Sequence, residues 1–378
     1  MRISVLQDQL ARGLNIVGRA VDPRPTLPVL ANVLLATDES RLKLAATNLE
    51  LTIITSIGAK VDKSGAITLP AKTFSELVNN LMPDRVDLNL DSATQTVNVR
   101  SGMTNSNIRG INSAEFPPLN EDFAPDLVMP AKTFKEMVFQ TQFASARDDA
   151  RPTLTGIYTH LEKGVLTMAA ADGFRLAVRT TRIEDNGGGT KTDLIIPAKA
   201  LSEVARIIGD EDKELAISLP GQQDRVVFLY ENTLIATQVI DGKFPDFTAI
   251  IPKSYSTAVT VYTSDLLKAC KRAEIFARDS NYSARILVRP ATEPSTPGEI
   301  TVVGRSPERG DNEGVLDASI EGNSLEVAFN IRFLIDVLSV MTDEQVVLES
   351  NGPAHPGVIR PRDRDDFICV VMPMSTTR

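Results

Sequence analysis

The chain has 378 residues, a length that suggests two or three domains. Hydrophobic residues make up 42% and charged residues 24%, as is usual for globular proteins, so the chain can bury sizeable cores. The net charge of −9 argues against a simple basic nucleic-acid binder, because such a domain normally carries an excess of Lys and Arg.

Cysteine content and hydropathy bound the environment of the protein. Cys270 and Cys369 are too few for a disulfide framework and lack the spacing of a metal site. The sequence turns polar directly after Leu6, too early for a signal peptide, and no uncharged apolar stretch is long enough to span a membrane. We therefore expect a cytoplasmic protein.

Six segments carry apolar residues at the i, i+3, i+4, i+7 spacing of an amphipathic helix. In chain order, this spacing predicts helices over residues 8–21, 72–81, 132–147, 199–208, 264–278 and 330–340. Their first apolar anchors are Leu10, Phe74, Phe134, Leu201, Leu266 and Phe333. Successive anchors are 60 to 67 residues apart, which indicates a repeated supersecondary unit.

Between the helices the apolar pattern changes to period two. Val86, Leu88 and Leu90 alternate with polar residues, and Leu215 and Ile217 do the same. This alternation is typical of half-buried antiparallel strands. Each unit of about 60 residues is therefore predicted to be one helix with several strands.

A longer period groups the six units in pairs. Phe116-Pro117 recurs as Phe244-Pro245 after 128 residues, and the RPTL sequence at 24–27 recurs at 151–154 after 127. We predict an α+β protein of three repeated domains, near residues 1–121, 125–250 and 255–378. Residues 187–189 and 290–298 are predicted loops, because both are rich in turn-forming residues.

Patterns typical of catalysis are missing from the sequence. His160 and His355 have no Ser or Cys partner in a nucleophile motif, and no HExxH, GxSxG or Walker A pattern occurs. The three glycines at 187–189 could cradle a phosphate, but a strand-like Ile-Ile pair follows where a helix would be needed, which favours a flexible loop. Three aspartates within 363–366 alternate with arginines, which favours a solvated charged loop over a metal site. We expect no enzymatic activity, no metal and no cofactor.

Several segments taken together are similar to one known family. They are residues 24–30 (RPTLPVL), 170–176 (AADGFRL), 244–245 (FP), 328–338 (AFNIRFLIDVL) and 370–374 (VVMPM). Each is weak alone, but their order and their spread over the whole chain resemble the bacterial DNA polymerase III beta subunits, the sliding clamps.

The resemblance implies an assembly and a set of partners. Members form head-to-tail homodimers, whose six domains close into a ring around duplex DNA with twelve helices lining the hole. They have no catalytic group. They tether the replicative polymerase alpha subunit, and a clamp loader opens the ring with ATP. Other polymerases, ligase and mismatch-repair proteins bind through short peptides, and no membrane is involved.

With the resemblance, the distribution of charge becomes informative. The six predicted helices sum to +6, which leaves −15 for the rest of the chain. Nearby helices would matter more to DNA than a distant acidic rim, since the Debye length is about 8 Å. The predicted DNA contacts are basic residues of the helices together with Arg24, which matches a DNA-contacting arginine of the family: Arg12, Arg19, Arg24, Lys132, Lys135, Arg147, Lys199, Arg206, Lys268, Lys271 and Arg272. The alternative is that Lys and Arg are simply good helix formers on a solvent-exposed face.

The family's peptide-binding groove lies between its second and third domains and accepts a glutamine and terminal hydrophobic residues. The matching positions are Arg151, Leu154, Ala171, Gly173, Phe174, Leu176, Pro245, Ile250, Val347, Val370, Val371, Met372, Pro373 and Met374. The alternative for the apolar members is core packing. Ala171 and Phe174 replace a common threonine and histidine, and Ala249 replaces a common arginine, so the groove should be more apolar than usual.

Two further regions depart from the family pattern. Asp148, Pro152 and Thr153 stand where relatives often have one polar and two aromatic residues, which removes a stacking surface for DNA. The tail 375–378 is slightly longer than usual.

The dimer contact is predicted from four positions. Ile275 and Phe276 match apolar residues that meet the first domain of the other subunit. On the first-domain side, Ile108 matches one of the residues that they meet, and Ser106 replaces a usual aromatic residue.

Two alternative functions are considered. One is a ring-shaped recruiting scaffold without a replicative role, and the other is a hydrolase that uses the acidic segment 363–366. The basic helices disfavour the first alternative, and the missing motifs disfavour the second.

Overall fold

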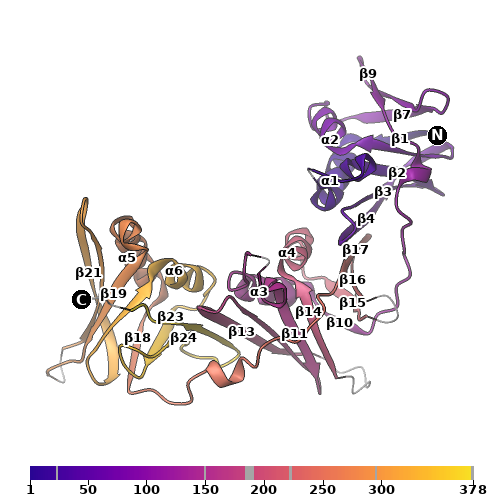
Figure 1. The fold of residues 1–378 in the computed structure, drawn as a ribbon. Coiled ribbons are helices and arrows are strands. Elements are labelled where there is room, and N and C mark those ends of the chain that lie inside the picture. The colour runs from indigo at the N-terminus through magenta and orange to yellow at the C-terminus, as the bar shows by residue number, and fades with distance from the viewer. Residues whose placement is uncertain (23, 149, 184–190, 221–223, 294–295, 376–378) are drawn as a thin grey trace. The chain divides into compact units, whose positions relative to one another are not determined.

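A computed structural model of the chain describes residues 1–22, 24–148, 150–183, 191–220, 224–293 and 296–375 (Figure 1). The glycines at 187–189 and the last three residues of the tail lie outside these ranges. Within them the chain forms two compact units, residues 1–134 with 203–239 and residues 135–202 with 240–378.

All six predicted helices are present. They are α1 (Gln7–Val17), α2 (Ala71–Asn79), α3 (Ala131–Gln142), α4 (Ala198–Ile207), α5 (Thr263–Ala277) and α6 (Ile331–Ser339). The buried side chains Leu10, Leu14 and Val17 of α1 follow the spacing that predicted the helix. At α6, the side chain of Asn330 accepts a hydrogen bond from the backbone N–H of Arg332 and so caps the first turn.

Two predicted helix ends are wrong by four or five residues, and the other ends differ by one or two. The first helix ends at Val17 and continues only as a 3₁₀ turn over Gly18–Ala20. The third ends at Gln142 rather than at 147. There the backbone N–H and the hydroxyl of Ser145 both donate to the carbonyl of Gln142, at 3.2 and 2.8 Å. A hydroxyl that bonds a nearby carbonyl in this way competes with the helical pattern.

The first unit contains two antiparallel sheets. One has the order β5-β1-β7-β8-β9 and consists of β1 (Arg2–Leu6), β5 (Lys60–Lys63), β7 (Arg85–Asp91), β8 (Thr96–Ser101) and β9 (Thr104–Arg109). The other has the order β10-β15-β16-β17-β4-β3-β2-β6 and consists of β2 (Asn32–Asp38), β3 (Arg41–Thr47), β4 (Leu51–Gly58), β6 (Ala66–Pro70), β10 (Leu127–Pro130), β15 (Glu214–Ser218), β16 (Arg225–Tyr230) and β17 (Thr233–Gln238). The predicted period-two segments therefore lie in β7 and β15, as expected.

The second unit is built on one antiparallel sheet of 12 strands, in the order β14-β11-β12-β13-β25-β24-β23-β18-β21-β20-β19-β22. The strands are β11 (Gly156–Glu162), β12 (Val165–Ala171), β13 (Arg175–Arg182), β14 (Thr192–Pro197), β18 (Thr257–Tyr262), β19 (Ser283–Arg289), β20 (Gly298–Ser306), β21 (Gly310–Gly322), β22 (Leu325–Asn330), β23 (Gln345–Ser350), β24 (Gly357–Pro361) and β25 (Phe367–Val371). The described residues between β19 and β20 form the connection that the sequence predicted at 290–298.

Strand pairs between distant segments join the repeats within each unit. In the first unit β17 pairs with β4, with Ile235 opposite Ile53. In the second unit β13 pairs with β25, with Leu176 opposite Val370. Because these pairs make the sheets continuous, the two compact units divide the chain differently from the three predicted domains, whose boundaries stay a prediction.

Candidate functional site

Much of the predicted groove lies on one face of the second unit's sheet. Leu154, Ala171, Leu176 and Val370 belong to a single buried apolar cluster. The register puts Ala171 beside Leu176, and Leu176 beside Val370, on adjacent strands. The segment 240–251 packs on the cluster through Ile240, Phe244, Phe247 and Ile251. These predicted groove residues can therefore serve only as the floor of a site.

Tyr158 anchors the segment 240–251 at the margin of this apolar cluster. Its ring stacks on Phe244 at 5.4 Å and meets Phe247 edge-on at 5.9 Å between centroids. The Tyr158 hydroxyl donates to the carboxylate of Asp193. Burial and this carboxylate raise the pKa of Tyr158 to about 12. The phenol therefore stays protonated and holds its hydrogen bond at neutral pH.

Two predicted groove residues are packed away from the floor. Val371 pairs with Arg175, one position from the Leu176–Val370 pair, so its side chain points to the opposite face of the sheet and is fully buried. Val347 is buried on β23, opposite Arg360 of β24. For both residues the core-packing alternative is the one that fits the structure.

An exposed apolar rim stands beside the buried floor. Phe174 is 61% exposed, Ile250 43% and Met372 39%, while Gly173 and Pro245 are exposed as well. The backbone N–H of Met372 donates to the carbonyl of Phe174 at 2.8 Å, which fixes these two rim residues side by side. Exposed large apolar side chains gathered in this way commonly mark a binding surface.

The C-terminal segment after β25 runs between two parts of the unit. Beyond the bond from Met372 to Phe174, the backbone N–H of Met374 donates to the carbonyl of Ala328 on β22, at 2.8 Å. Pro373 lies between them and is half-buried, as is Met374. The segment is thus held by the 172–175 turn on one side and by β22 on the other.

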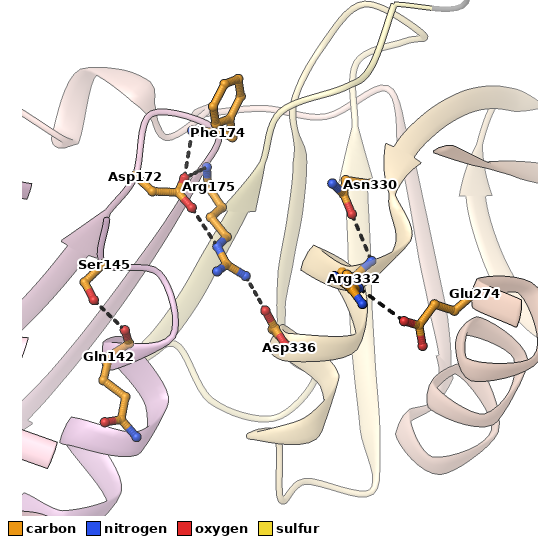
Figure 2. A network of polar contacts seen from close by, with 9 residues as sticks. All are labelled: Gln142, Ser145, Asp172, Phe174, Arg175, Glu274, Asn330, Arg332 and Asp336. Atoms are coloured by element: carbon orange, nitrogen blue, oxygen red, sulfur yellow. Dashed lines mark hydrogen bonds and ion pairs between the residues drawn. The ribbon is translucent and has the colours of Figure 1, made fainter. Parts of the chain in front are cut away.

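The 172–175 turn presents Phe174 rigidly (Figure 2). The carboxylate of Asp172 accepts hydrogen bonds from the backbone N–H groups of Phe174 and Arg175, at 2.9 and 3.0 Å. Gly173 has a φ of +92°, which side chains disfavour, and an added Cβ would lie 2.8 Å from Nη1 of Arg151. Arg151 in turn donates from Nη2 to the carbonyl of Asp172 at 3.0 Å.

Arg175 connects this turn to helix α6, as Figure 2 shows. Its side chain is only 5% exposed, and it pairs with Asp172 at 3.0 Å and with Asp336 at 2.6 Å. The guanidinium also lies over the rings of Phe143 and Phe333, at 5.4 and 4.5 Å from the centroids. Sequence reasoning missed both Arg175 and Asp336 as site residues. The only sequence signal was their position inside two of the segments that carry the family resemblance.

A polar cavity of about 590 Å³ opens beside the same turn. Its wall includes Arg147, Arg151, Phe174, Glu274, Asn330 and Arg332. Arg147 was predicted to contact DNA and Arg151 to line the groove, so the two predicted sites meet at this cavity.

Almost all the predicted DNA-binding side chains are exposed; Lys135 is half-buried. Their distribution differs from the prediction, because Arg19 and Arg147 lie beyond the ends of the α-helices. The same is true of Arg278, which the predicted helix 264–278 included. The six helices as observed carry net charges of 0, 0, +1, +1, +1 and 0, which total +3 rather than +6. The net positive charge of the six helices is thus half of the value predicted from the sequence.

Glu203 of α4 pairs with two of the predicted DNA contacts. Its carboxylate lies 2.8 Å from Nη1 of Arg19 and 2.5 Å from Nη1 of Arg206. One acidic side chain therefore offsets part of the positive potential of both.

The strands at the ends of the three sheets, β5, β9, β10, β6, β14 and β22, each have one edge without a partner strand among the described residues. Two unpaired edges concern the predicted dimer contact. One is β9, at the end of its sheet, and the other is the first part of β21, which pairs with β20 on one side only over residues 310–318. The predicted dimer residues lie close to these edges in sequence or in space. Ile275 of α5 is 50% exposed and Phe276 is half-buried, and α5 packs on β21.

On the domain 1 side, the predicted dimer residues are less exposed than those of α5. Ile108 is only 7% exposed, because it faces inward opposite Val97 of β8. Ser106 is half-buried. The exposed groups at this edge include Met103, which is fully exposed in the turn before β9, and Arg109. Sequence alone could not identify an edge strand, since that depends on the order of strands in the sheet.

The candidates for catalysis have simpler roles. His160 lies 2.8 Å from Asp193 and 3.4 Å from Glu162. The sequence predicted a solvated charged loop at residues 363–366. In the structure Asp366, at the end of this segment, pairs with the buried Arg179, so that end of the segment is anchored. Burial raises the pKa of the Cys270 thiol to about 12.

Among the described residues, no group of His, Cys, Asp and Glu could hold a metal ion. No helix in the same part of the chain is long and apolar enough to cross a membrane.

Comparisons with known proteins agree over the whole chain. Family models of the DNA polymerase III beta subunit match its N-terminal domain at residues 1–120, its central domain at 128–246 and its C-terminal domain at 248–375. A beta sliding clamp of Synechococcus elongatus is 32% identical, and the match covers 99% of each chain. The DNA polymerase sliding clamp of Bacillus subtilis has a TM-score of 0.92 at 26% identity, covering 100% of this chain and 99% of that one.

The fold is accordingly the α+β fold of the three-domain sliding clamps, with antiparallel sheets. The chain belongs to the family of DNA polymerase III beta subunits, the beta sliding clamps, which are non-catalytic accessory subunits.

Proposed function

We propose that two copies of this chain form a ring that encircles duplex DNA and tethers the replicative polymerase to it. The observation that carries this proposal is that two of the unpaired strand edges, β9 in one unit and the first part of β21 in the other, lie near the predicted dimer residues. An exposed edge is a template for pairing with another chain. Two different edges on one chain suit a head-to-tail contact, which gives a ring when its rotation closes.

The side chains at the two edges are complementary. Arg109 ends β9, while Asp311 and Glu313 lie on the first part of β21. Exposed apolar groups, Met103 near one edge and Ile275 near the other, would be covered by the same contact. Opposite charges around an apolar centre favour one register of docking.

The exposed arginines and lysines support contact with the DNA backbone. A modest net charge of +3 on the helices, inside an otherwise acidic chain, suits a ring that holds a duplex loosely and slides. Contacts of this kind are independent of sequence, because they involve phosphates only.

The rim of Phe174, Ile250 and Met372 supports docking of a short peptide with hydrophobic end residues. An exposed methionine adapts to different ligands, which suits a groove with several partners. We assign to it the polymerase alpha subunit, the clamp loader, other polymerases, ligase and mismatch-repair proteins. These partners place the protein in the bacterial cytoplasm, at the replisome.

A primer-extension assay tests this function. The protein is loaded by a clamp loader on a primed circular template, and the length of the products made by the polymerase is measured in the presence of excess competitor DNA. We expect products extended over the whole template only when the protein is present. Products of the same length with and without it would contradict the proposal.

A further inference from the structure

The cavity beside the 172–175 turn is lined by groups of both charges, but three of its four carboxylates already have arginine partners. Asp172 and Asp336 both pair with Arg175, and Glu274 lies 3.2 Å from Nε of Arg332. These acidic groups hold the arginines in place. They are therefore supports of the cavity wall rather than free ligands for a cation.

Hydrogen-bond donors remain available in the same cavity. Arg332 binds Glu274 through Nε, while its guanidinium lies 3.8 Å over the ring of Tyr282, which fixes its plane. Arg151 uses Nη2 on the carbonyl of Asp172. Within the described part of the chain, neither Arg147 nor Arg151 has a carboxylate at ion-pair distance. Asn330 uses its side-chain oxygen for capping α6, which leaves its amide N–H groups to donate.

We propose that this cavity binds one acidic side chain of a peptide whose hydrophobic end lies on the rim at Phe174. The inference rests on the proposed function of the groove and adds to it a specificity for charge. A planar guanidinium pairs with a carboxylate through two parallel hydrogen bonds, and Arg332 is held in one orientation for such a pair. Phe174 lines the cavity and also belongs to the rim, so one peptide can reach both.

The charges of the wall favour a single carboxylate over a DNA backbone. Asp148, Asp172, Glu274 and Asp336 all line the cavity. They would repel a run of phosphates, whereas one carboxylate can approach the guanidinium groups between them. The arginine at 332 and its partner Glu274 thus select for one negative charge.

Binding of synthetic peptides tests the proposal. The probes are acetylated, amidated peptides with a glutamine and a Leu-Phe end, in which a single Glu or its isostere Gln is placed at each remaining position in turn. At one position we expect the Glu peptide to bind the wild-type dimer at least fivefold more tightly than the Gln peptide. The ratio should fall to about one in R332Q and should stay unchanged in the control R285Q. Arg285 is also paired with a glutamate, Glu326, but lies outside the cavity.

The outcomes separate this inference from the groove itself. If no peptide binds, both the groove and the acidic specificity are refuted. If Glu and Gln peptides bind equally well at every position, the acidic specificity is refuted and the groove stands. If R332Q keeps the preference but weakens binding of duplex DNA, the cavity serves phosphates instead. Should R332Q not fold, R151Q gives the same readout, since Arg151 also lines the cavity.

Discussion

Nη1 of Arg175 donates a hydrogen bond of 2.6 Å to Oδ2 of Asp336, which ties strand β13 to helix α6 across 161 positions of sequence. The same guanidinium also binds the carboxylate of Asp172. One buried cation therefore holds both the turn that presents Phe174 and the helix that carries Arg332.

Replacing Asp336 with Ala should destabilise the protein by about 1–2 kcal/mol, because Arg175 would keep only one of its two carboxylate partners. We discount the larger cost typical of buried pairs, since the side chain of Asp336 is 40% exposed. The urea midpoint of unfolding measures the effect. The control E326A removes an exposed partner of Arg285 and should cost less than about 0.5 kcal/mol. Equal losses in the two variants would contradict a special role for the Arg175–Asp336 pair.

Replacing Glu203 with Gln should strengthen binding of duplex DNA roughly two- to fivefold at low salt, because Arg19 and Arg206 lose their shared carboxylate. The gain should shrink as salt is added. Fluorescence anisotropy with a labelled duplex measures both effects. The control E231Q also removes one acidic charge, that of Glu231, which pairs with Lys213. If both variants behave alike, the change reflects net charge alone and the two arginines are not DNA contacts.

Replacing Ile275 with Glu should weaken the dimer at least about tenfold, because a charge would be placed in an apolar contact. The monomer should stay folded, since Ile275 is half-exposed on α5. Sedimentation velocity over a range of concentrations gives the dissociation constant. The control V165E places the same charge on an exposed valine of β12. A dimer that survives I275E unchanged would exclude α5 from the interface.

Deleting residues 372–378 should abolish stimulation of the polymerase and leave the dimer intact. The deletion removes Met372 from the rim, together with the bonds to Phe174 and Ala328, but keeps strand β25. Primer extension and sedimentation report the two properties. A shorter deletion, which removes only residues 376–378 so that the chain ends at Ser375, keeps both bonds and should retain stimulation. Unchanged affinity of the longer deletion for a polymerase tail peptide would refute the groove assignment.

Local periodicity was enough to predict the helices and many strands, because burial of one face is written directly into the spacing of apolar residues. Leu10, Leu14 and Val17 illustrate this, since all three are buried on one face of α1. The ends of helices were less predictable. At the end of α3, both the backbone N–H and the hydroxyl of Ser145 bond to the carbonyl of Gln142, and the spacing of apolar residues gives no sign of these bonds.

The candidate site could be predicted only in part, because it depends on which strands become neighbours. Val370 and Val371 are adjacent in sequence, yet only Val370 belongs to the cluster beneath the rim. Likewise, Ile108 faces inward, and nothing in its local sequence indicates that β9 is an edge. The pair of Arg175 with Asp336 also forms only once β13 and α6 are packed together.

Retention on DNA of different topology tests encirclement most directly. The protein is loaded on nicked circular DNA, purified by gel filtration and then divided, and one half is linearised with a restriction enzyme. We predict that it stays on the circular DNA and is lost from the linear DNA, and that blocking both ends of the linear DNA with bound protein restores retention. Equal retention on circular and unblocked linear DNA would contradict the account, because it would mean that direct contacts rather than a closed ring hold the protein in place.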